Sequence, residues 1–250
     1  MRELIHNIVD WIYPPRCIAC RNLLPLQDKI RRRLWLCEYC VNLFVQLETP
    51  GCKICSVPVP ESVEVCASCY GKNYAFENNR AGFVYEGLVR DLIRDIKFRK
   101  KKSIAEGLGR LWATHIIEPL LDGLTLVPLP MHKAKRRQRG FDQAYVIAKA
   151  IGEAKGITVI DILERTKYTP PQSGLHPRQR IENVAGAFRI KKQFEHIVAG
   201  QSFILIDDIY TTGASLNECA KVLKSNGAVN VYTMTLAITV KSNSDDGNGT

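Results

Sequence analysis

The sequence lacks any apolar run that approaches the roughly 18 residues needed to cross a membrane. Its first residues also lack the uninterrupted apolar stretch of a signal peptide, because Glu3, Asp10 and Trp11 fall where that stretch would lie. Acidic residues are comparatively few, with 25 Asp and Glu against 35 Lys and Arg, which gives a formal net charge of +10. We therefore expect a cytoplasmic protein that is not integral to a membrane and whose partners are acidic, such as phosphates or nucleic acid.

A second absence concerns the region from Cys17 to about Tyr74, which contains no long periodic segment. Short apolar stretches broken by prolines cannot bury enough apolar area to fold by packing alone, so another source of stability is needed. Eight of the nine cysteines lie in this region as four C-x-x-C pairs: Cys17 and Cys20, Cys37 and Cys40, Cys52 and Cys55, Cys66 and Cys69. In a reducing compartment this pattern indicates bound metal and not disulfides.

The spacing of the pairs predicts two zinc ions. Two residues between the cysteines of a pair let a tight turn point both sulfurs at one ion, and two turns complete a tetrahedron. With all four positions filled by thiolate, each zinc would be structural. Sequential pairing is the simplest arrangement, and a cross-braced one remains open. Arg31 to Arg33 and Trp35 could grip nucleic acid or a protein, or could equally form a solvated loop edge.

After Phe76 the chain alternates between strand-like apolar runs and helical patterns, which predicts an α/β domain with a mostly parallel, Rossmann-like sheet. The expected strands are 80–85, 124–129, 157–160, 203–206 and 229–238, and the expected helices are 88–97, 103–121, 143–155 and 214–226. We divide the chain into residues 1–75, with a helix at 3–13 before the zinc module, the α/β domain at 76–240, and a polar tail at 241–250 that we expect to be disordered. Cys219, the ninth cysteine, is expected in the core.

The segment from Ile204 to Ser215 predicts a phosphate site. An apolar strand is expected to end at Asp207 and Asp208, followed by a turn of hydroxyl residues with Gly213 and then a helix. Ligands bind at the carboxyl ends of parallel strands, and the start of a helix directs N–H groups at an anion. Ser215 and Glu218 fit a capping box, and Gly227 fits the helix stop.

Two adjacent carboxylates beside a phosphate would repel it unless the ligand also offers hydroxyl donors, as a ribose does. In the alternative interpretation, the Asp and Thr residues merely cap the helix. Two consecutive acids are more than capping requires.

The segment resembles the signature of the type I phosphoribosyltransferases, which bind 5-phosphoribosyl-1-pyrophosphate (PRPP). The resemblance implies that Asp207 and Asp208 contact the ribose hydroxyls and makes Asp208 the candidate catalytic residue. It also implies a 5′-phosphate loop made of Thr211, Thr212, Gly213, Ala214 and Ser215.

Further motifs are similar to the ComF family of competence-associated proteins, which carry an N-terminal double zinc ribbon: residues 127–132, the basic stretch to Arg139, residues 140–144, residues 169–175 and residues 183–188. The resemblance implies a pyrophosphate loop at 129–133, with Lys133, Arg136, Arg137 and Arg139 neutralising phosphate; a basic surface loop is the alternative. The polar segment 169–175 contains Pro and Gly and is suited to a mobile lid, or is equally well explained as a long loop. His132 is equally well explained as a packed loop residue. Asp142 departs from the usual Asn, and a charge there could weaken anion binding. Arg21 and Ser56 replace a glycine common after the second cysteine, which should change the turn and keep the ligands.

Three functions are compatible with these features. The first is a competence protein that binds a PRPP-type ligand and, through its basic surface, single-stranded DNA. The second is an active phosphoribosyltransferase that uses Mg²⁺ on the pyrophosphate, although no segment looks like a nucleobase pocket. The third is an adaptor whose zinc module docks on a helicase or channel protein. The first is our preferred hypothesis.

Overall fold

The structure is a computed structural model that describes residues 14–25, 34–44, 47, 51–114, 123–168 and 182–240. The expected helix at 3–13, the basic residues 31–33, the expected lid at 169–175 and the tail at 241–250 lie outside the described residues. Within the described part, no helix combines the length and the apolar character that a membrane span requires.

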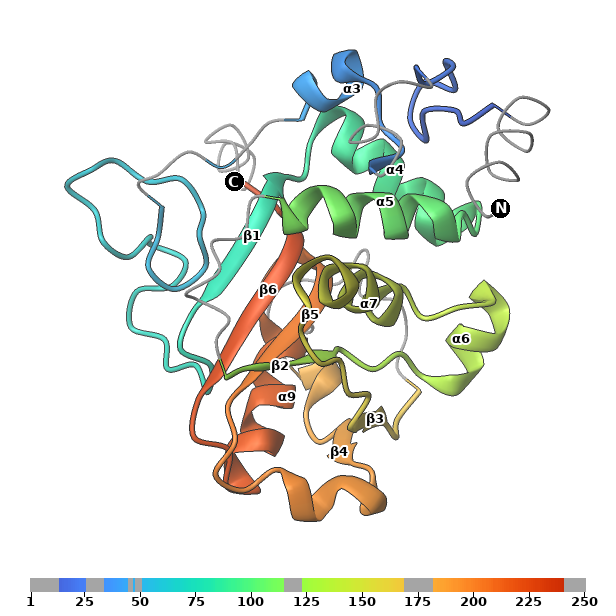
Figure 1. Cartoon of the computed structure of the whole chain (residues 1–250). Helices are drawn as coiled ribbons and strands as arrows, with labels where there is room; N and C mark the ends of the chain where they lie inside the picture. Colours follow the sequence, from blue (N-terminus) through green and yellow to red (C-terminus); the bar gives the residue numbers. More distant parts are fainter. Residues whose placement is uncertain are drawn as a thin grey trace, which may run out of the picture.

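A four-stranded parallel sheet forms the centre of the α/β domain (Figure 1). Its order is β1 (Asn79–Val84), β6 (Val231–Ile238), β5 (Phe203–Tyr210) and β2 (Thr125–Pro128). The apolar runs form these strands because both faces of the sheet are covered. The strand expected at 157–160 is reduced to a single parallel bridge from Val159 to Leu126.

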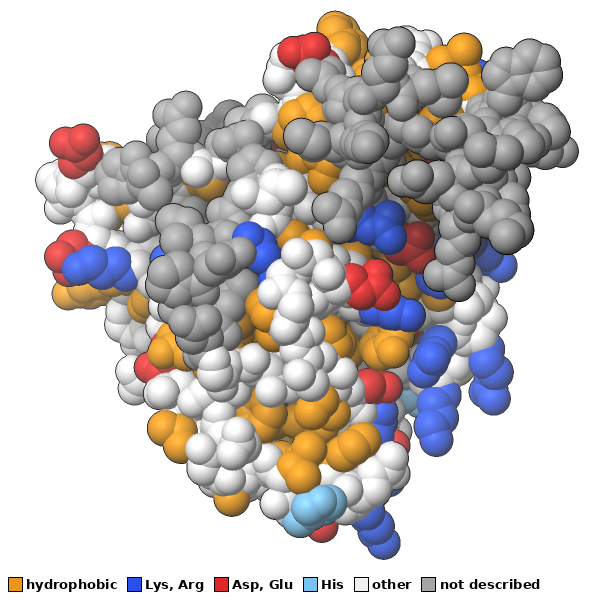
Figure 2. Space-filling model, in the orientation of Figure 1, with side chains coloured by type: hydrophobic (Ala, Val, Ile, Leu, Met, Phe, Trp, Pro, Cys, Tyr) orange, Lys and Arg blue, Asp and Glu red, His pale blue; other side chains and the backbone are white. Residues whose placement is uncertain are grey.

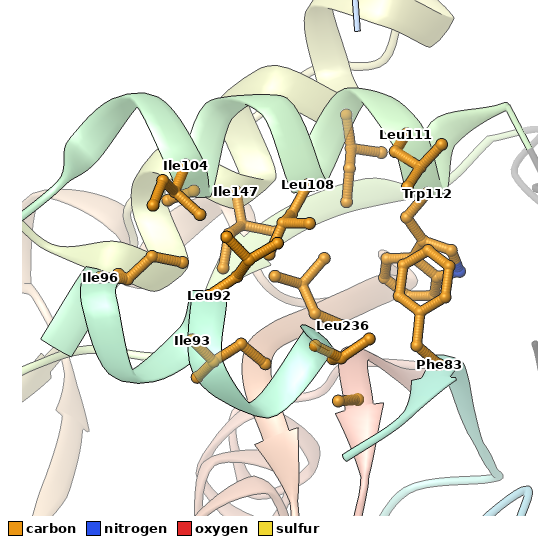
Figure 3. Packing of buried hydrophobic residues seen from close by; sticks show 14 of the residues in the cluster. Phe83, Leu92, Ile93, Ile96, Ile104, Leu108, Leu111, Trp112, Ile147 and Leu236 are labelled. Carbon is orange, nitrogen blue, oxygen red and sulfur yellow. The ribbon is translucent and has the colours of Figure 1, made fainter. Parts of the chain in front are cut away.

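One face of the sheet is covered by α4 (Gly87–Phe98), α5 (Lys102–Ala113) and α7 (Gln143–Lys155). Figure 3 shows their buried side chains meeting those of the sheet, with Leu108 and Ile147 near Leu236. On β5, Ile204 and Ile206 belong to this cluster. The cluster explains why α4 and α7 form where their apolar spacing predicts them, whereas α5 ends at Ala113, before the expected end at 121.

The other face is covered by α9 (Ala214–Ser225), which ends beside Gly227 as expected. Phe203 and Leu205 pack with α9, so successive residues of β5 alternate between the two faces. Cys219 is fully buried in this cluster, which confirms its expected place in the core.

The structure contains several short elements that we did not expect from the sequence. The basic stretch forms a short helix, α6 (Lys133–Arg139), which is not among the expected helices. Beyond α7, β3 (Leu163–Arg165) and β4 (Phe188–Ile190) pair antiparallel, and the 3-10 helix η2 (Lys192–Ile197) follows. A short helix in the cysteine-rich region, α3 (Glu38–Asn42), was also unexpected. Short elements such as these carry too few residues for a periodic pattern to reveal them.

The cysteine-rich region packs directly on the α/β domain. Its first part, drawn in darker blue in Figure 1, lies over α4 and α5, where Phe44 contacts Phe83 with ring centroids 5.0 Å apart. Trp35, a candidate grip residue, is partly buried beneath Arg110 of α5. The second part, residues 51–75, lies beside β1 and belongs to the hydrophobic cluster that includes α9.

Candidate ligand site and zinc centres

The loop between β5 and α9 is shaped by Gly213. This residue has a φ of 71° and precedes the first residue of α9. A Cβ at this position would lie 2.6 Å from the Tyr210 hydroxyl, so a side chain is excluded by space as well as by backbone conformation. Thr211 is exposed and the Thr212 hydroxyl accepts a hydrogen bond from the Ala214 N–H at 3.4 Å. The loop therefore leads into a helix start at the carboxyl edge of the sheet, as predicted.

The expected capping box does not form. Because α9 begins at Ala214, Ser215 lies inside the helix and not at its N-cap. The Glu218 carboxylate instead accepts a hydrogen bond from the Gly186 N–H at 3.3 Å and pairs with Lys221 at 2.6 Å. The hydrogen bond from Gly186 connects α9 to the segment before β4. The capping-box motif placed the N-cap at Ser215, two residues after the observed N-cap at Gly213.

The two acidic residues lie within β5, which continues to Tyr210 and does not end at them as expected. Consecutive strand residues point to opposite faces. Asp208 points toward α4 and α7, where its carboxylate pairs with Lys97 Nζ at 2.8 Å and accepts a hydrogen bond from the Gln143 amide. Asp208 is only 4% exposed, so its contact with a ligand stays a prediction that requires Lys97 to move.

Asp207 is partly exposed and lies on the side of the sheet that faces Arg165 and Cys219. Burial of its carboxyl group and the neighbouring Asp208 carboxylate raise the pKa of Asp207 to about 8, although Lys97 opposes the shift. A carboxyl group with such a pKa can hold or release a proton near neutral pH. Of the two acids, Asp207 is the more exposed residue.

Cationic side chains from three other elements surround the acids: Lys97 of α4, Lys135 and Arg139 of α6, and Arg165 of β3. Burial lowers the pKa of Lys135, and the nearby positive charges of Arg139 and Lys97 lower it further. One guanidinium nitrogen of Arg139 is buried without a hydrogen-bond partner in the described part of the chain. Cations that lie close enough to repel one another favour the binding of an anion between them.

The candidate residue Lys133 is exposed at the start of α6. Its charge acts on Glu164, whose pKa is lowered first by Arg189 and further by Lys133. Arg139 does lie near both acids, as its proposed role requires. Sequence reasoning missed Lys97, Lys135 and Arg165 as site residues. Lys97 and Lys135 belong to clusters with many basic residues, and no local signal distinguishes the ones that turn inward.

Asp142 and His132 hold the segment around α6 in place. The Asp142 carboxylate accepts hydrogen bonds from the N–H groups of Met131 at 3.1 Å and Tyr145 at 3.3 Å, and so caps α7. His132 caps α6 by accepting a hydrogen bond from the Ala134 N–H. Both side chains thus accept hydrogen bonds from backbone N–H groups. The Asp142 charge is partly satisfied by these donors, which limits the weakening of anion binding that we expected from it.

The eight paired cysteines form two groups of four that follow the order of the chain, the first from Cys17 to Cys40 and the second from Cys52 to Cys69. In each group the sulfur atoms lie within 4.8 Å of one another. The Sγ atoms of Cys20 and Cys37 are 3.6 Å apart, and those of Cys55 and Cys66 are 3.7 Å apart. Tetrahedral zinc with Zn–S bonds of about 2.3 Å requires about 3.8 Å between sulfurs, so the groups fit the ion. These are structural zinc sites, and the cross-braced arrangement is excluded.

In each zinc site, backbone N–H groups stabilise the thiolate form of one cysteine, which is the form that binds a cation. Burial opposes ionisation of Cys17, but backbone N–H groups, first that of Cys37, lower its pKa to about 7. The same balance of burial and N–H donors, first that of Cys66, lowers the pKa of Cys52 to about 7. Burial, followed by the adjacent sulfurs, raises the pKa values of Cys40, Cys55 and Cys69. Four thiolates can coexist in one group only when a metal ion balances their charge.

The turns after the second cysteines keep the left-handed conformation that glycine favours. Arg21 has a φ of 67° and Ser56 a φ of 69°. We expected these substitutions to change the turn, and that expectation was wrong. The cysteine geometry requires a left-handed residue, and metal binding and packing compensate for its strain.

Comparison with known proteins agrees with this architecture. Residues 8–70 match the double zinc ribbon domain, and residues 137–248 match the phosphoribosyl transferase domain. The chain is 27% identical over 240 residues to DNA utilization protein YhgH of Escherichia coli K12, an alignment that covers 91% of this chain and 98% of that protein. It is 26% identical over 248 residues to competence protein ComFC of Bacillus subtilis, covering 88% and 93% of the two chains. A solved structure of an adenine phosphoribosyltransferase matches 58% of this chain and 74% of its own at 17% identity, with a TM-score of 0.37.

The fold and the cysteine sites together define a protein with a phosphoribosyl transferase domain joined to a double zinc ribbon. Along nearly its whole length the chain is similar to proteins named DNA utilization protein YhgH and competence protein ComFC.

Proposed function

We propose that this protein binds a PRPP-type sugar phosphate at the edge of the sheet between β5 and α9, and that it acts in the handling of DNA during competence. The ligand proposal rests on one observation. Asp207 and Asp208 lie close to cations from α4, α6 and β3, next to the start of α9, where Gly213 is the N-cap. Acceptors for hydroxyl groups and sites for two separate anions match the chemistry of a phosphorylated, pyrophosphorylated pentose.

The proposed roles follow from position. Thr211, Thr212, Gly213, Ala214 and Ser215 surround the 5′-phosphate with N–H and hydroxyl donors. Asp207 accepts hydrogen bonds from the ribose hydroxyls. Lys135, Arg139 and Lys133 neutralise the pyrophosphate, which would arrive with Mg²⁺. Asp208 fixes Lys97, and after Lys97 moves to the pyrophosphate Asp208 is the candidate catalytic carboxylate.

Binding of single-stranded DNA is supported by the surface next to this site. Figure 2 shows Lys and Arg side chains gathered at the edge of the molecule that α6 occupies in Figure 1. Arg136 and Arg137 are exposed there. Phe98, at the end of α4, is 76% exposed and is followed by exposed Arg99. An exposed ring among cations is a stacking platform for bases, and the names of the relatives, DNA utilization and competence proteins, point to the same ligand.

We further propose a cytoplasmic location, because eight thiolates hold zinc only where the compartment keeps them reduced.

Calorimetry with PRPP and Mg²⁺ tests the ligand proposal. We expect measurable binding by the unmodified protein and at least a roughly tenfold loss for Asp207→Ala, the size of one strong charge-assisted hydrogen bond. Asp91→Ala is the matched control, since Asp91 is an exposed acid on α4 paired only loosely with Arg90 at 3.7 Å. Absence of binding by the unmodified protein, or equal loss in both variants, would refute the proposal.

Fluorescence anisotropy with single-stranded oligothymidylate over a salt series tests the DNA proposal. Phe98→Ala should weaken binding by roughly fivefold or more, because one base–aromatic stack contributes about 1–3 kcal/mol. Tyr70→Ala is the control, as Tyr70 is 80% exposed but lies on the second zinc ribbon. A salt-independent affinity, or equal effects of the two substitutions, would contradict the proposed surface.

A further inference from the structure

The second zinc site lies against the phosphate loop. Tyr210, the last residue of β5, is only 4% exposed. Its hydroxyl packs against Gly213, 2.6 Å from the position that a Cβ on this glycine would take. The same hydroxyl is near Tyr74, Cys69 and Cys55; burial raises the pKa of Tyr210 far above its usual value, and these neighbours raise it further. One aromatic side chain therefore separates the cysteine group Cys52 to Cys69 from the residue that gives the loop its shape.

A second connection runs through the backbone. The segment that leaves Cys69 reaches Ala75, whose N–H donates a 2.7 Å hydrogen bond to the Asn217 side chain in the first turn of α9. Tyr74 and Phe76, on either side of Ala75, have ring centroids 4.8 Å apart, and Phe76 is buried. The helix start that follows the loop is thus held by the chain emerging from the second zinc site.

The second zinc site is also attached to the sheet. The Asn79 N–H donates to the Ile54 carbonyl at 2.7 Å, and the Asn79 side chain donates to the Cys55 carbonyl at 3.2 Å. Asn79 is 1% exposed and is the first residue of β1. The site therefore has a rigid base, and the contacts with Tyr210 and Ala75 transmit its position to the loop.

The first zinc site has a different environment. Cys17 and Cys40 belong to the hydrophobic cluster of α4 and α5. Ile18 packs so closely on α5 that a Cβ at Gly107 would lie 2.5 Å from its Cδ1 atom. These contacts place the first site over the face of the sheet opposite to α9. The molecule thus contains an internal control for any effect of zinc on the loop.

We propose that the second zinc site, and not the first, positions the phosphate loop, with Tyr210 and Asn217 as the positioning residues. The proposal rests on the proposed function only in naming the loop as the place where the sugar phosphate binds. Loss of zinc from the second site frees the chain between Cys69 and Ala75, and this removes the support beneath Gly213 and the hydrogen bond to α9. Ligand binding then depends on the metal state of a site that does not touch the ligand.

Hydrogen exchange of the amides at 211–217 in the full chain, with zinc content measured in parallel, tests the coupling without any ligand. Cys69→Ser and Cys40→Ser compare buried cysteines of the two sites, 3% and 2% exposed. Each variant should lose one zinc, and only Cys69→Ser should speed exchange at 211–217, by about tenfold or more. Equal exchange rates in the two variants would overturn the proposal.

A second pair of variants leaves the cysteines intact, in case Cys69→Ser fails to fold. Asn217→Ala removes the hydrogen bond from Ala75, and Asn226→Ala at the other end of α9 removes only contacts with Val222 and Ser225. Both should retain two zinc ions, and only Asn217→Ala should speed exchange at 211–217, by about threefold or more. Unchanged exchange in Asn217→Ala would refute the coupling. If exchange responds as expected and PRPP still does not bind the unmodified protein, the proposed ligand fails while the coupling stands.

Discussion

The pair formed by Lys97 and Asp208 gives the sharpest test of how this site is built. Lys97 Nζ lies 2.8 Å from the Asp208 carboxylate, and the two side chains are 24% and 6% exposed. Replacing Lys97 with Met keeps the length of the side chain and removes its charge. Asp208 is then left buried with the Gln143 hydrogen bond as its described partner.

Removing one partner of a buried ion pair costs about 3–5 kcal/mol, because the remaining charge stays away from water without compensation. Since Lys97 is partly exposed, solvent compensates some of the loss, and we expect about 3 kcal/mol for Lys97→Met. Asp208→Asn leaves a lysine that can turn to solvent and should cost about 1–2 kcal/mol. The double variant should cost less than the sum of the two by at least about 1 kcal/mol.

Urea unfolding followed by circular dichroism at neutral pH and fixed zinc concentration measures these differences. Lys101→Met is the control, because Lys101 pairs with Asp95 at 2.9 Å near the end of the same helix and both side chains are more exposed than Asp208. We expect no more than about 1 kcal/mol for the control. A cost below about 0.5 kcal/mol for Lys97→Met, or strict additivity in the double variant, would refute the interpretation of Asp208 as a buried charge that depends on Lys97.

Three further substitutions have defined outcomes. Gly213→Ala should abolish PRPP binding in calorimetry while α9 persists by circular dichroism, because its Cβ would collide with Tyr210; retained affinity would contradict the loop geometry. Arg21→Gly should raise the free energy of unfolding by about 1 kcal/mol in urea, since glycine relieves a φ of 67°, and a loss of stability would show that the turn is unstrained. Asp207→Asn should flatten the pH dependence of stability. The pKa of Asp207 is raised to about 8 in the folded chain, so the group favours folding at low pH and this contribution declines as pH rises from about 4 to 8; urea midpoints between pH 6 and 9 that fall equally in both proteins would count against this.

Much of the zinc module and the sheet was predictable because the signals are local. A C-x-x-C turn brings its two sulfurs together whatever surrounds it, so the ligands were evident from spacing. The helix expected at 143–155 has those bounds in the structure, since its apolar spacing, the cap at Asp142 and the stop at Gly156 agree with one another. The strand before Asp207 was evident for the same reason, as its apolar run has to be buried.

The arrangement of the site required the tertiary structure. Lys97 and Asp208 are 111 residues apart in the chain, and nothing near Lys97 distinguishes it from the other cations of its cluster. Asp207 and Asp208 look like one acidic pair in the sequence, yet a strand that continues to Tyr210 directs them to opposite faces of the sheet. The contact of the second zinc ribbon with Tyr210 and α9 likewise depends on packing between distant segments. Local spacing determined which residues bind metal and which form the sheet, whereas long-range packing decided which charges meet, because only the folded chain brings α4, α6, β3 and the second zinc ribbon to the same end of β5.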